Sequence, residues 1–380
     1  MAPQFRAPYA DADETIAGRL LASTPRSEDA EARVDVRARR LVEAIRSHSG
    51  GLGGIEDFLH AYSLSTREGL ALMVLAEALL RVPDAMTADA LIEDKLAAGD
   101  WSHADRSGTF LVSASAWTLG ITARVILPGE TPETIVESVV KRLGLPTVRI
   151  ATRQAMRLLG SHFVLGQTIE EALSRAGSHR EFRYSFDMLG EGARTAEDAA
   201  RYFDAYAKAI AAIGTKGGNA PLPARPGISV KLSALHSRYE AVSRERVLKE
   251  LTPHVLELAR QAKSFDLNFT VDAEEADRLE LSLDVIGKVL ADPSLSGWEG
   301  FGLAVQAYQK RAPAVIAWLN DIAHAHRRRL MVRLVKGAYW DTEVKRAQER
   351  GLPDYPVFTR KSMTDLSYLA AAERMLAHRP

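Results

Sequence analysis

The sequence predicts an α/β protein, with an N-terminal arm and an α-helical domain ahead of alternating strands and helices. Three observations support this class. Residues 1–26 begin with Pro3 and Pro8 and little periodicity, residues 27–178 have helical periodicity, and residues 179–380 alternate short apolar runs with amphipathic stretches. At 380 residues the chain is longer than most single-core domains. We therefore expect domains at 1–26, 27–178 and 179–380.

The second region contains three clear helix signals. Residues 27–47 place Val34, Leu41, Val42 and Ile45 on one face of a helix. Residues 65–82 are more apolar and predict a central packing helix. Residues 131–145 open with a Thr-Pro-Glu sequence, which provides an N-cap, a proline at the first helical position and a carboxylate in the first turn. A helical domain that packs against the rest of the chain follows from these signals.

After Gly177 strands and helices alternate, which is typical of parallel strands joined by right-handed crossovers. Strands are predicted at 182–189, 227–235, 267–273, 300–308 and 330–338, and helices at 195–213, 243–263, 275–290 and 312–327.

Each predicted strand carries one ionisable or amide residue near its carboxyl end. These residues are Asp187, Lys231, Asp272, Gln306 and Arg333. A parallel strand buried on both faces is usually continuous Val, Ile and Leu, and an unpaired interior charge is unfavourable. Charges at the same end of five successive strands converge only around a common axis. The pattern predicts a (βα)8 TIM-type barrel, with about five βα units present and the active site at the carboxyl ends of the strands.

Arg333 raises the question of why a core strand carries a charge. Alternation places Met331, Arg333 and Val335 on one face, so an inward Arg333 would join the other strand-end residues in a polar cluster. One interpretation is an ion network that closes the barrel mouth. The other is a site for a zwitterion or a polar cofactor.

Composition excludes several functions. The chain has 49 Lys and Arg residues and 49 Asp and Glu residues, so its net charge does not favour nucleic acid or an anionic membrane as a partner. It has no Cys, which excludes disulfides and thiolate chemistry. The N-terminal segment lacks the apolar core of a signal peptide, and no long uncharged apolar run predicts a membrane span. We expect a cytoplasmic protein. No metal site is expected, because His324 and His326 do not face one another on a helix.

Five segments in order resemble the proline dehydrogenase domain of the proline utilization A family of bacterial bifunctional flavoenzymes. They are SFDMLGEGART (185–195), GISVKLSALHSRYE (227–240), FTVDAEEADRLELSLDVI (269–286), QAYQKRAPAVIAWL (306–319) and RLVKGAYWDTEVKRAQERGLPDYPVFTRK (333–361). The resemblance implies FAD-dependent oxidation of L-proline to Δ1-pyrroline-5-carboxylate by hydride transfer to flavin N5. It further implies electron transfer to a quinone, a peripheral position at the inner face of the membrane, and an aldehyde dehydrogenase domain in the parent chain.

The resemblance also implies roles for individual residues. Lys231 would bind the substrate carboxylate, Asp272 would orient the catalytic network, and Arg333 and Gln306 would contact the flavin, with Arg333 stabilising its reduced form. Tyr339 would form a wall of the substrate site. The remaining implied cofactor contacts are Ala273, Lys336, Gly337, Ala338 and Trp340, and the implied gating residues are Asp187 and Glu191, the latter pairing with a distal arginine.

The chain also departs from the family pattern. We do not find the family's pair of arginines on the last barrel helix, about three βα units of the expected eight, or the aldehyde dehydrogenase domain. The chain therefore looks like a fragment, expected to bind FAD poorly and to turn over proline slowly or not at all. No basic strand-helix-helix segment opens the chain, since Arg6, Arg19 and Arg26 are the only cations in the first thirty residues, so DNA binding is not expected.

Two alternatives remain open at the level of sequence. An interior lysine on a barrel strand also suits a flavin-independent Schiff-base lyase with Lys231 as the nucleophile. A helical region plus a partial barrel also suits a non-catalytic binding or assembly module.

Overall fold

The computed structural model describes residues 4–23, 27–48, 86–87, 164–179 and 181–377. The chain forms two compact units, one of residues 1–27 and 168–380 and one of residues 28–167. In the second unit, helix α2 (Glu28–His48) confirms the helix predicted at 27–47, and its apolar residues Val34, Leu41, Val42 and Ile45 are exposed. The helices predicted at 65–82 and 131–145 lie outside the described residues.

The first unit contains a sheet of five parallel strands in the order β1-β2-β3-β4-β5. They are β1 (Ser185–Asp187), β2 (Gly227–Val230), β3 (Asn268–Val271), β4 (Phe301–Gln306) and β5 (Met331–Val335). Every strand overlaps its predicted range, which confirms the α/β class. The strand predicted at 227–235 is too long, because Leu232–Leu235 forms the one-turn helix α11. A short buried apolar run looks the same in a strand and in a helix.

The helices of more than one turn from residue 169 onward are α9 (Ile169–Gly177), α10 (Ala196–Lys216), α12 (Arg244–Ser264), α13 (Leu279–Leu290), α14 (Ala312–His326), α15 (Trp340–Glu349) and α16 (Lys361–Ala377). Helices α10, α12, α13 and α14 connect successive strands and overlap the four predicted ranges, whereas α9 precedes β1 and α15 and α16 follow β5. Helix α10 begins with a reciprocal capping box between Thr195 and Asp198. Helix α15 was not predicted, because it is mostly polar and exposed and has few apolar residues to show a helical period.

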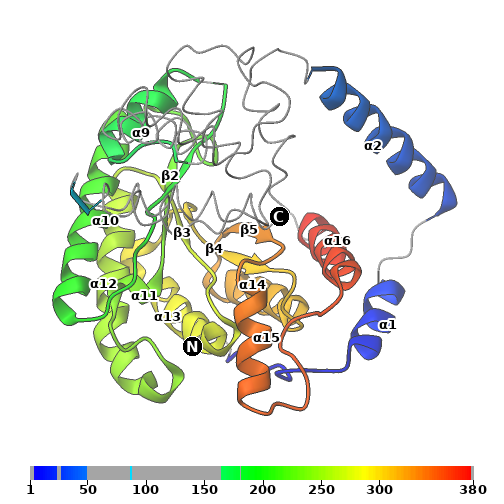
Figure 1. Ribbon diagram of the computed structural model, residues 1–380. Helices are drawn as coiled ribbons and strands as arrows, with labels where there is room; N and C mark the ends of the chain where they lie inside the picture. Colours follow the sequence, from blue (N-terminus) through cyan, green and yellow to red (C-terminus); the bar gives the residue numbers. More distant parts are fainter. Residues whose placement is uncertain (1–3, 24–26, 49–85, 88–163, 180, 378–380) are drawn as a thin grey trace, which may run out of the picture. The chain divides into compact units, whose positions relative to one another are not determined.

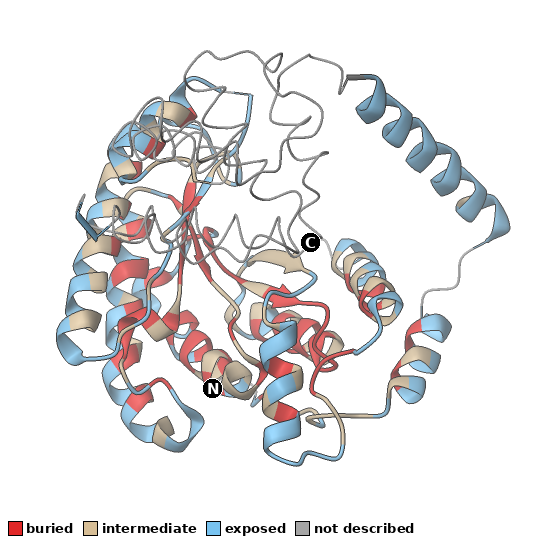
Figure 2. Ribbon diagram, viewed as in Figure 1, coloured by how far each residue is buried: buried red, intermediate tan, exposed pale blue. Residues whose placement is uncertain are grey.

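The two faces of the sheet differ in chemistry. Large side chains such as Ile228, Phe269 and Leu303 are buried on one face, where α10, α12, α13 and α14 lie outside the strands (Figures 1 and 2). The opposite face carries small and polar side chains. Extending the pairing register by one residue gives the row Lys231, Asp272, Ala304 and Arg333 across β2 to β5. The sheet therefore presents an apolar back to the helices and a polar front.

The sheet is strongly curved. One guanidinium nitrogen of Arg333 on β5 lies 2.6 Å from the hydroxyl oxygen of Ser185 on β1. In a flat sheet, four strand spacings of about 4.8 Å would separate these strands by roughly 19 Å. The polar front is therefore the concave side, as in the inside of a (βα)8 barrel.

The N-terminal arm packs on this unit. Helix α1 (Asp13–Ser23), which was not predicted within the arm, buries Ile16 and Leu20 against Phe358 and Ala370. The ammonium of Lys310, whose side chain is 2% exposed, lies 2.8 Å from Asp13 and also contacts Asp354 and the Asp11 carbonyl. An apolar contact and a buried ion pair thus fasten the arm.

Candidate active site at the strand ends

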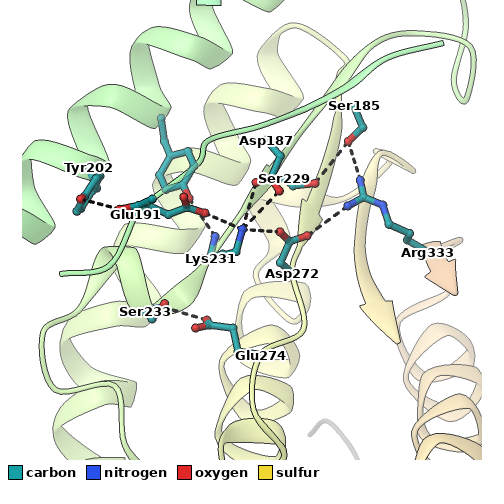
Figure 3. Close-up of polar contacts among 12 residues, drawn as sticks. Ser185, Asp187, Glu191, Tyr202, Ser229, Lys231, Ser233, Asp272, Glu274 and Arg333 are labelled. Atoms are coloured by element: carbon teal, nitrogen blue, oxygen red, sulfur yellow. Dashed lines mark hydrogen bonds and ion pairs between the residues drawn. The ribbon is translucent and has the colours of Figure 1, made fainter. Parts of the chain in front are cut away.

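Lys231 is the centre of a charged cluster on the concave side. It follows β2 directly, and its backbone N–H donates to the buried Tyr206 hydroxyl at 3.1 Å. Its ammonium lies 2.6 Å from Glu191, 3.2 Å from Asp272 and 3.4 Å from Asp187 (Figure 3). Two carboxylates from the end of β1 and one from the end of β3 therefore surround the ammonium that follows β2.

The cluster perturbs its own ionisation. Burial opposes the charge on Lys231, but the hydrogen bond to Glu191 and the charges of Asp187 and Asp272 outweigh it and raise the pKa of the ammonium. Burial and the negative charges of Asp272 and Glu191, opposed by Lys231, raise the pKa of Asp187 to about 6. Lys231 is thus held as a cation, whereas Asp187 titrates close to neutral pH.

Arg333 extends the cluster to the fifth strand. Its guanidinium donates to Asp272 at 3.2 Å and to Ser185 at 2.6 Å. Ala304 is the residue of β4 between Asp272 and Arg333 in the row, and its small side chain lets the two groups meet across it. Of the five predicted strand-end residues, the structure brings Asp187, Lys231, Asp272 and Arg333 into one network.

Gln306 is not bonded to this network. Its amide nitrogen donates to the Glu274 carbonyl at 2.8 Å, and its amide oxygen accepts from the N–H of Ala338 at 3.2 Å. The side chain is buried. Gln306 therefore links backbone segments beside the charged cluster.

The other residues implied as cofactor contacts lie around this end of the sheet. Lys336 forms an ion pair with Asp365 on α16 at 2.5 Å. Gly337, at φ +145°, approaches the ring of Tyr308 so closely that a Cβ would lie 2.4 Å from it. This close approach is to a protein side chain, and the contact of Gly337 with the cofactor that the resemblance implies stays a prediction.

Two aromatic residues and one alanine complete the predicted set. Tyr339 precedes α15 and is half-buried, and burial with the charge of Glu274 raises its pKa to about 12. Trp340 is 42% exposed and donates from its indole nitrogen to the Phe358 carbonyl at 3.0 Å. Ala273 lines a small cavity together with Asp272 and Gln306.

Sequence reasoning missed some members of the site. Glu191 was expected to pair with a distal arginine, and its described partner is Lys231. Ser185 and Ser229, 3.4 Å apart, were not singled out, although alternation from Asp187 and Lys231 places both on the concave face. Glu274 was also missed, because the run of acids after β3 does not reveal which carboxylate is buried.

The geometry suits a small zwitterion. An ammonium can bind a carboxylate, and neighbouring carboxylates can accept hydrogen bonds from an amine. The concave position limits solvent access and strengthens these interactions. Within the described part of the chain, no group of three or more His, Asp or Glu side chains is placed to hold a metal ion.

A parallel α/β arc with a charged cluster at its strand ends defines a barrel-type enzyme domain. Residues 171–380 match the family model described as Proline dehydrogenase, and the chain belongs to this family. Residues 54–163, almost all outside the described residues, match the model described as DNA-binding domain of Proline dehydrogenase.

Known proteins support this membership. The chain is 47% identical to Bifunctional protein PutA of Salmonella typhimurium over 98% of its own length and 29% of the relative. It is 26% identical to Proline dehydrogenase of Deinococcus radiodurans over 51% of this chain and 57% of the relative. A crystal structure of a Bradyrhizobium japonicum Proline Utilization A mutant covers the whole chain at a TM-score of 0.73 and 66% identity, with 38% of that chain matched. The chain thus spans about 29% of the first of these relatives.

Proposed function

We propose that this domain oxidises L-proline to Δ1-pyrroline-5-carboxylate with FAD as the electron acceptor. The observation that carries the proposal is the cluster of Lys231, Asp187, Glu191, Asp272 and Arg333 at the carboxyl ends of the strands, in a chain of the proline dehydrogenase family.

The concave face has two properties that suit a flavin: the hydrogen-bond donors of Arg333, and small side chains that leave the neighbouring surface smooth. Two of the five N–H donors of the Arg333 guanidinium contact Asp272 and Ser185, and its side chain is 36% exposed, so the group is fixed and still reachable by a ligand. The sheet surface beside Arg333 is smooth, because its side chains there are small: Ser185, Ser229 and Ala304. Arg333 and the backbone near Ala273 are the residues that would hold FAD, and the bound flavin would supply the hydride acceptor.

The chain's own residues bind and orient the substrate. Lys231 pairs with the proline carboxylate, and the three carboxylates around it keep its ammonium charged. Asp272 contacts Lys231 and Arg333 at once and fixes the relative positions of the substrate and cofactor sides. Asp187, with a pKa of about 6, can hold a proton from the substrate amine near neutral pH. Tyr339 stays neutral and forms the adjoining wall.

Further proposals concern the parent protein. Electrons would pass to a quinone at the membrane surface, with no DNA involved. Among the described helices, none combines the length and apolar character that crossing a bilayer requires. An aldehyde dehydrogenase domain in the parent chain is supported by the word bifunctional in the name of the Salmonella typhimurium relative, of whose length this chain covers 29%.

The Schiff-base alternative has no support in the site. A nucleophilic lysine needs a lowered pKa, whereas the carboxylates around Lys231 raise it.

A product assay tests the proposal. The 380-residue chain with excess FAD and an artificial electron acceptor should form an imine that o-aminobenzaldehyde traps, at a low rate. Lys231→Met should raise KM for proline at least ~10-fold, because a charge-assisted hydrogen bond contributes about 1.5–3 kcal/mol. Lys361→Met, which removes an exposed ammonium of α16, is the matched control and should leave KM unchanged. Unaltered KM in Lys231→Met, or no imine in the unsubstituted chain, would refute the proposal.

A further inference from the structure

Five residues, one at or beyond the carboxyl end of each strand, form a continuous hydrogen-bonded belt. The N–H of Ala193 donates to the Ser233 carbonyl at 2.9 Å, and the N–H of Ser233 donates to a Glu274 carboxylate oxygen at 3.1 Å. Gln306 donates to the Glu274 carbonyl at 2.8 Å and accepts from the N–H of Ala338 at 3.2 Å. These residues follow or end β1 to β5 in order. The belt therefore ties all five strand-end segments together.

Glu274 is the charged member of this belt and joins it twice, through its side chain and its carbonyl. Its side chain is 6% exposed, and its second carboxylate oxygen lies 3.0 Å from Arg278. Burial raises the pKa of this carboxyl, opposed by the hydrogen bond to Ser233 and by Arg278. A carboxylate buried at this depth is retained because its hydrogen-bond partners are in place.

The belt reaches the active site through Ser233. Ser233 lies two residues after Lys231, in the first turn of α11, and Figure 3 shows the contact between Ser233 and Glu274 beside the cluster around Lys231. Helix α11 is a single turn without a side-chain cap at its start, so the Glu274 carboxylate satisfies an N–H that the turn itself leaves open. The direction in which Lys231 leaves β2 thus depends on Glu274.

The orientation of Gln306 fits the belt and no other arrangement. With its nitrogen toward the Glu274 carbonyl and its oxygen toward the Ala338 N–H, both contacts are donor to acceptor. The reversed amide would place the Gln306 oxygen against the Glu274 carbonyl oxygen, and the Gln306 nitrogen against the N–H of Ala338.

We infer that Glu274 is a positioning residue, which holds Lys231 among its three carboxylates by bonding the turn that follows it. One consequence of the inference, weaker proline binding when the Glu274 carboxylate is moved away, rests on the proposed function. The positioning of Lys231 itself can be measured without substrate.

Three variants separate position from charge. Glu274→Asp keeps the charge but withdraws the carboxylate by one methylene, out of reach of Ser233. Glu274→Gln keeps the length and one acceptor oxygen. Glu275→Asp is the matched control, because Glu275 pairs with Arg278 at 3.0 Å and Arg346 at 3.5 Å but has no described bond to the belt.

The readouts are amide hydrogen exchange over residues 231–236 and the rate at which acetic anhydride labels Lys231 relative to Lys310, a buried lysine far along the chain. In Glu274→Asp, exchange at Ser233 and labelling of Lys231 should both rise several-fold, while Lys310 is unchanged. Glu274→Gln and Glu275→Asp should resemble the unsubstituted chain. With proline turnover, Glu274→Asp should raise KM more than it lowers kcat.

Three results would overturn the inference. Faster exchange at Ser233 without faster labelling of Lys231 would show that Glu274 stabilises α11 but does not position Lys231. Equal acceleration at Lys231 and Lys310 would indicate general destabilisation. A Glu274→Gln variant as loose as Glu274→Asp would show that an acceptor oxygen within reach of Ser233 does not suffice to hold the turn. If Glu274→Asp does not fold, Gln306→Met loosens the same belt by removing the bond to the Glu274 carbonyl, and unchanged labelling of Lys231 in that variant would overturn the inference. Absence of turnover in the unsubstituted chain concerns the proposed function only, since exchange and labelling require no substrate.

Discussion

At the scale of single residues, the site is a cluster with more carboxylates than cations. Lys231 and Arg333 face Asp187, Glu191 and Asp272 within hydrogen-bonding or ion-pair distance. Like charges close together favour protonation of one of them, and Asp187 takes this role because Asp272 and Glu191 act on it together with burial.

Asp187→Asn should stabilise the folded chain above neutral pH. The folded pKa of about 6 lies above the ordinary value of 3.8, so the contribution of Asp187 to stability is fully present below 3.8 and is lost as the pH rises through about 6. Its side chain is 37% exposed, so solvent screening limits the gain to about 1 kcal/mol. The melting temperature of Asp187→Asn should exceed that of the unsubstituted chain by about 2–4 °C near pH 8, and by less near pH 5.

Asp204→Asn on the exposed side of α10 is the control and should show no such pH-dependent difference. A gain in Asp187→Asn that is equal at both pH values would contradict the explanation.

The sequence predicts much of the site at this scale. Asp187, Lys231, Asp272 and Arg333 are found from one rule, a polar residue near each strand end, because parallel strands bring their carboxyl ends together. The same rule finds Gln306 but cannot show that both ends of its amide bond to backbone segments. It also cannot show that Glu274 is buried, because that depends on the turn after β2, far away in the sequence.

At the scale of elements, the arm depends on few contacts. Helix α1 buries Ile16 and Leu20, and the rest of its surface is largely exposed. Its sequence did not predict a helix, because eleven residues with two buried side chains give almost no periodic signal. Contacts with Phe358 and Ala370 supply the stabilisation that local propensity lacks.

Leu20→Ala should destabilise the first unit by about 2–3 kcal/mol, because it removes buried methyl groups and leaves a cavity beside Phe358. Leu21→Ala on the same helix, where the leucine is 61% exposed, should change stability by less than about 0.5 kcal/mol. Urea unfolding midpoints measure both. Equal losses in the two variants would show that α1 does not pack as described.

At the scale of the whole molecule, the α/β class and the five parallel strands were predictable because strand and helix periods alternate clearly after residue 177. The curvature of the sheet was inferred from where the charges fall, and the contact between Arg333 and Ser185 confirms it. The two compact units divide at 27–28 and 167–168, and the domains expected from the periodicity, 1–26, 27–178 and 179–380, stay a prediction. Helix α9 packs with α10, a contact that the periodicity of the sequence cannot reveal.

The central claim is that the concave cluster is a flavin-dependent site for proline oxidation. It is tested most directly by the visible spectrum of the chain with excess FAD, recorded anaerobically before and after adding proline. The account predicts slow, proline-dependent bleaching of the flavin bands, which needs at least ~10-fold more proline in Lys231→Met and is absent in Arg333→Met, because free FAD does not oxidise proline. Flavin bands that persist in the unsubstituted chain, or that bleach at the same rate in the variants, would contradict it.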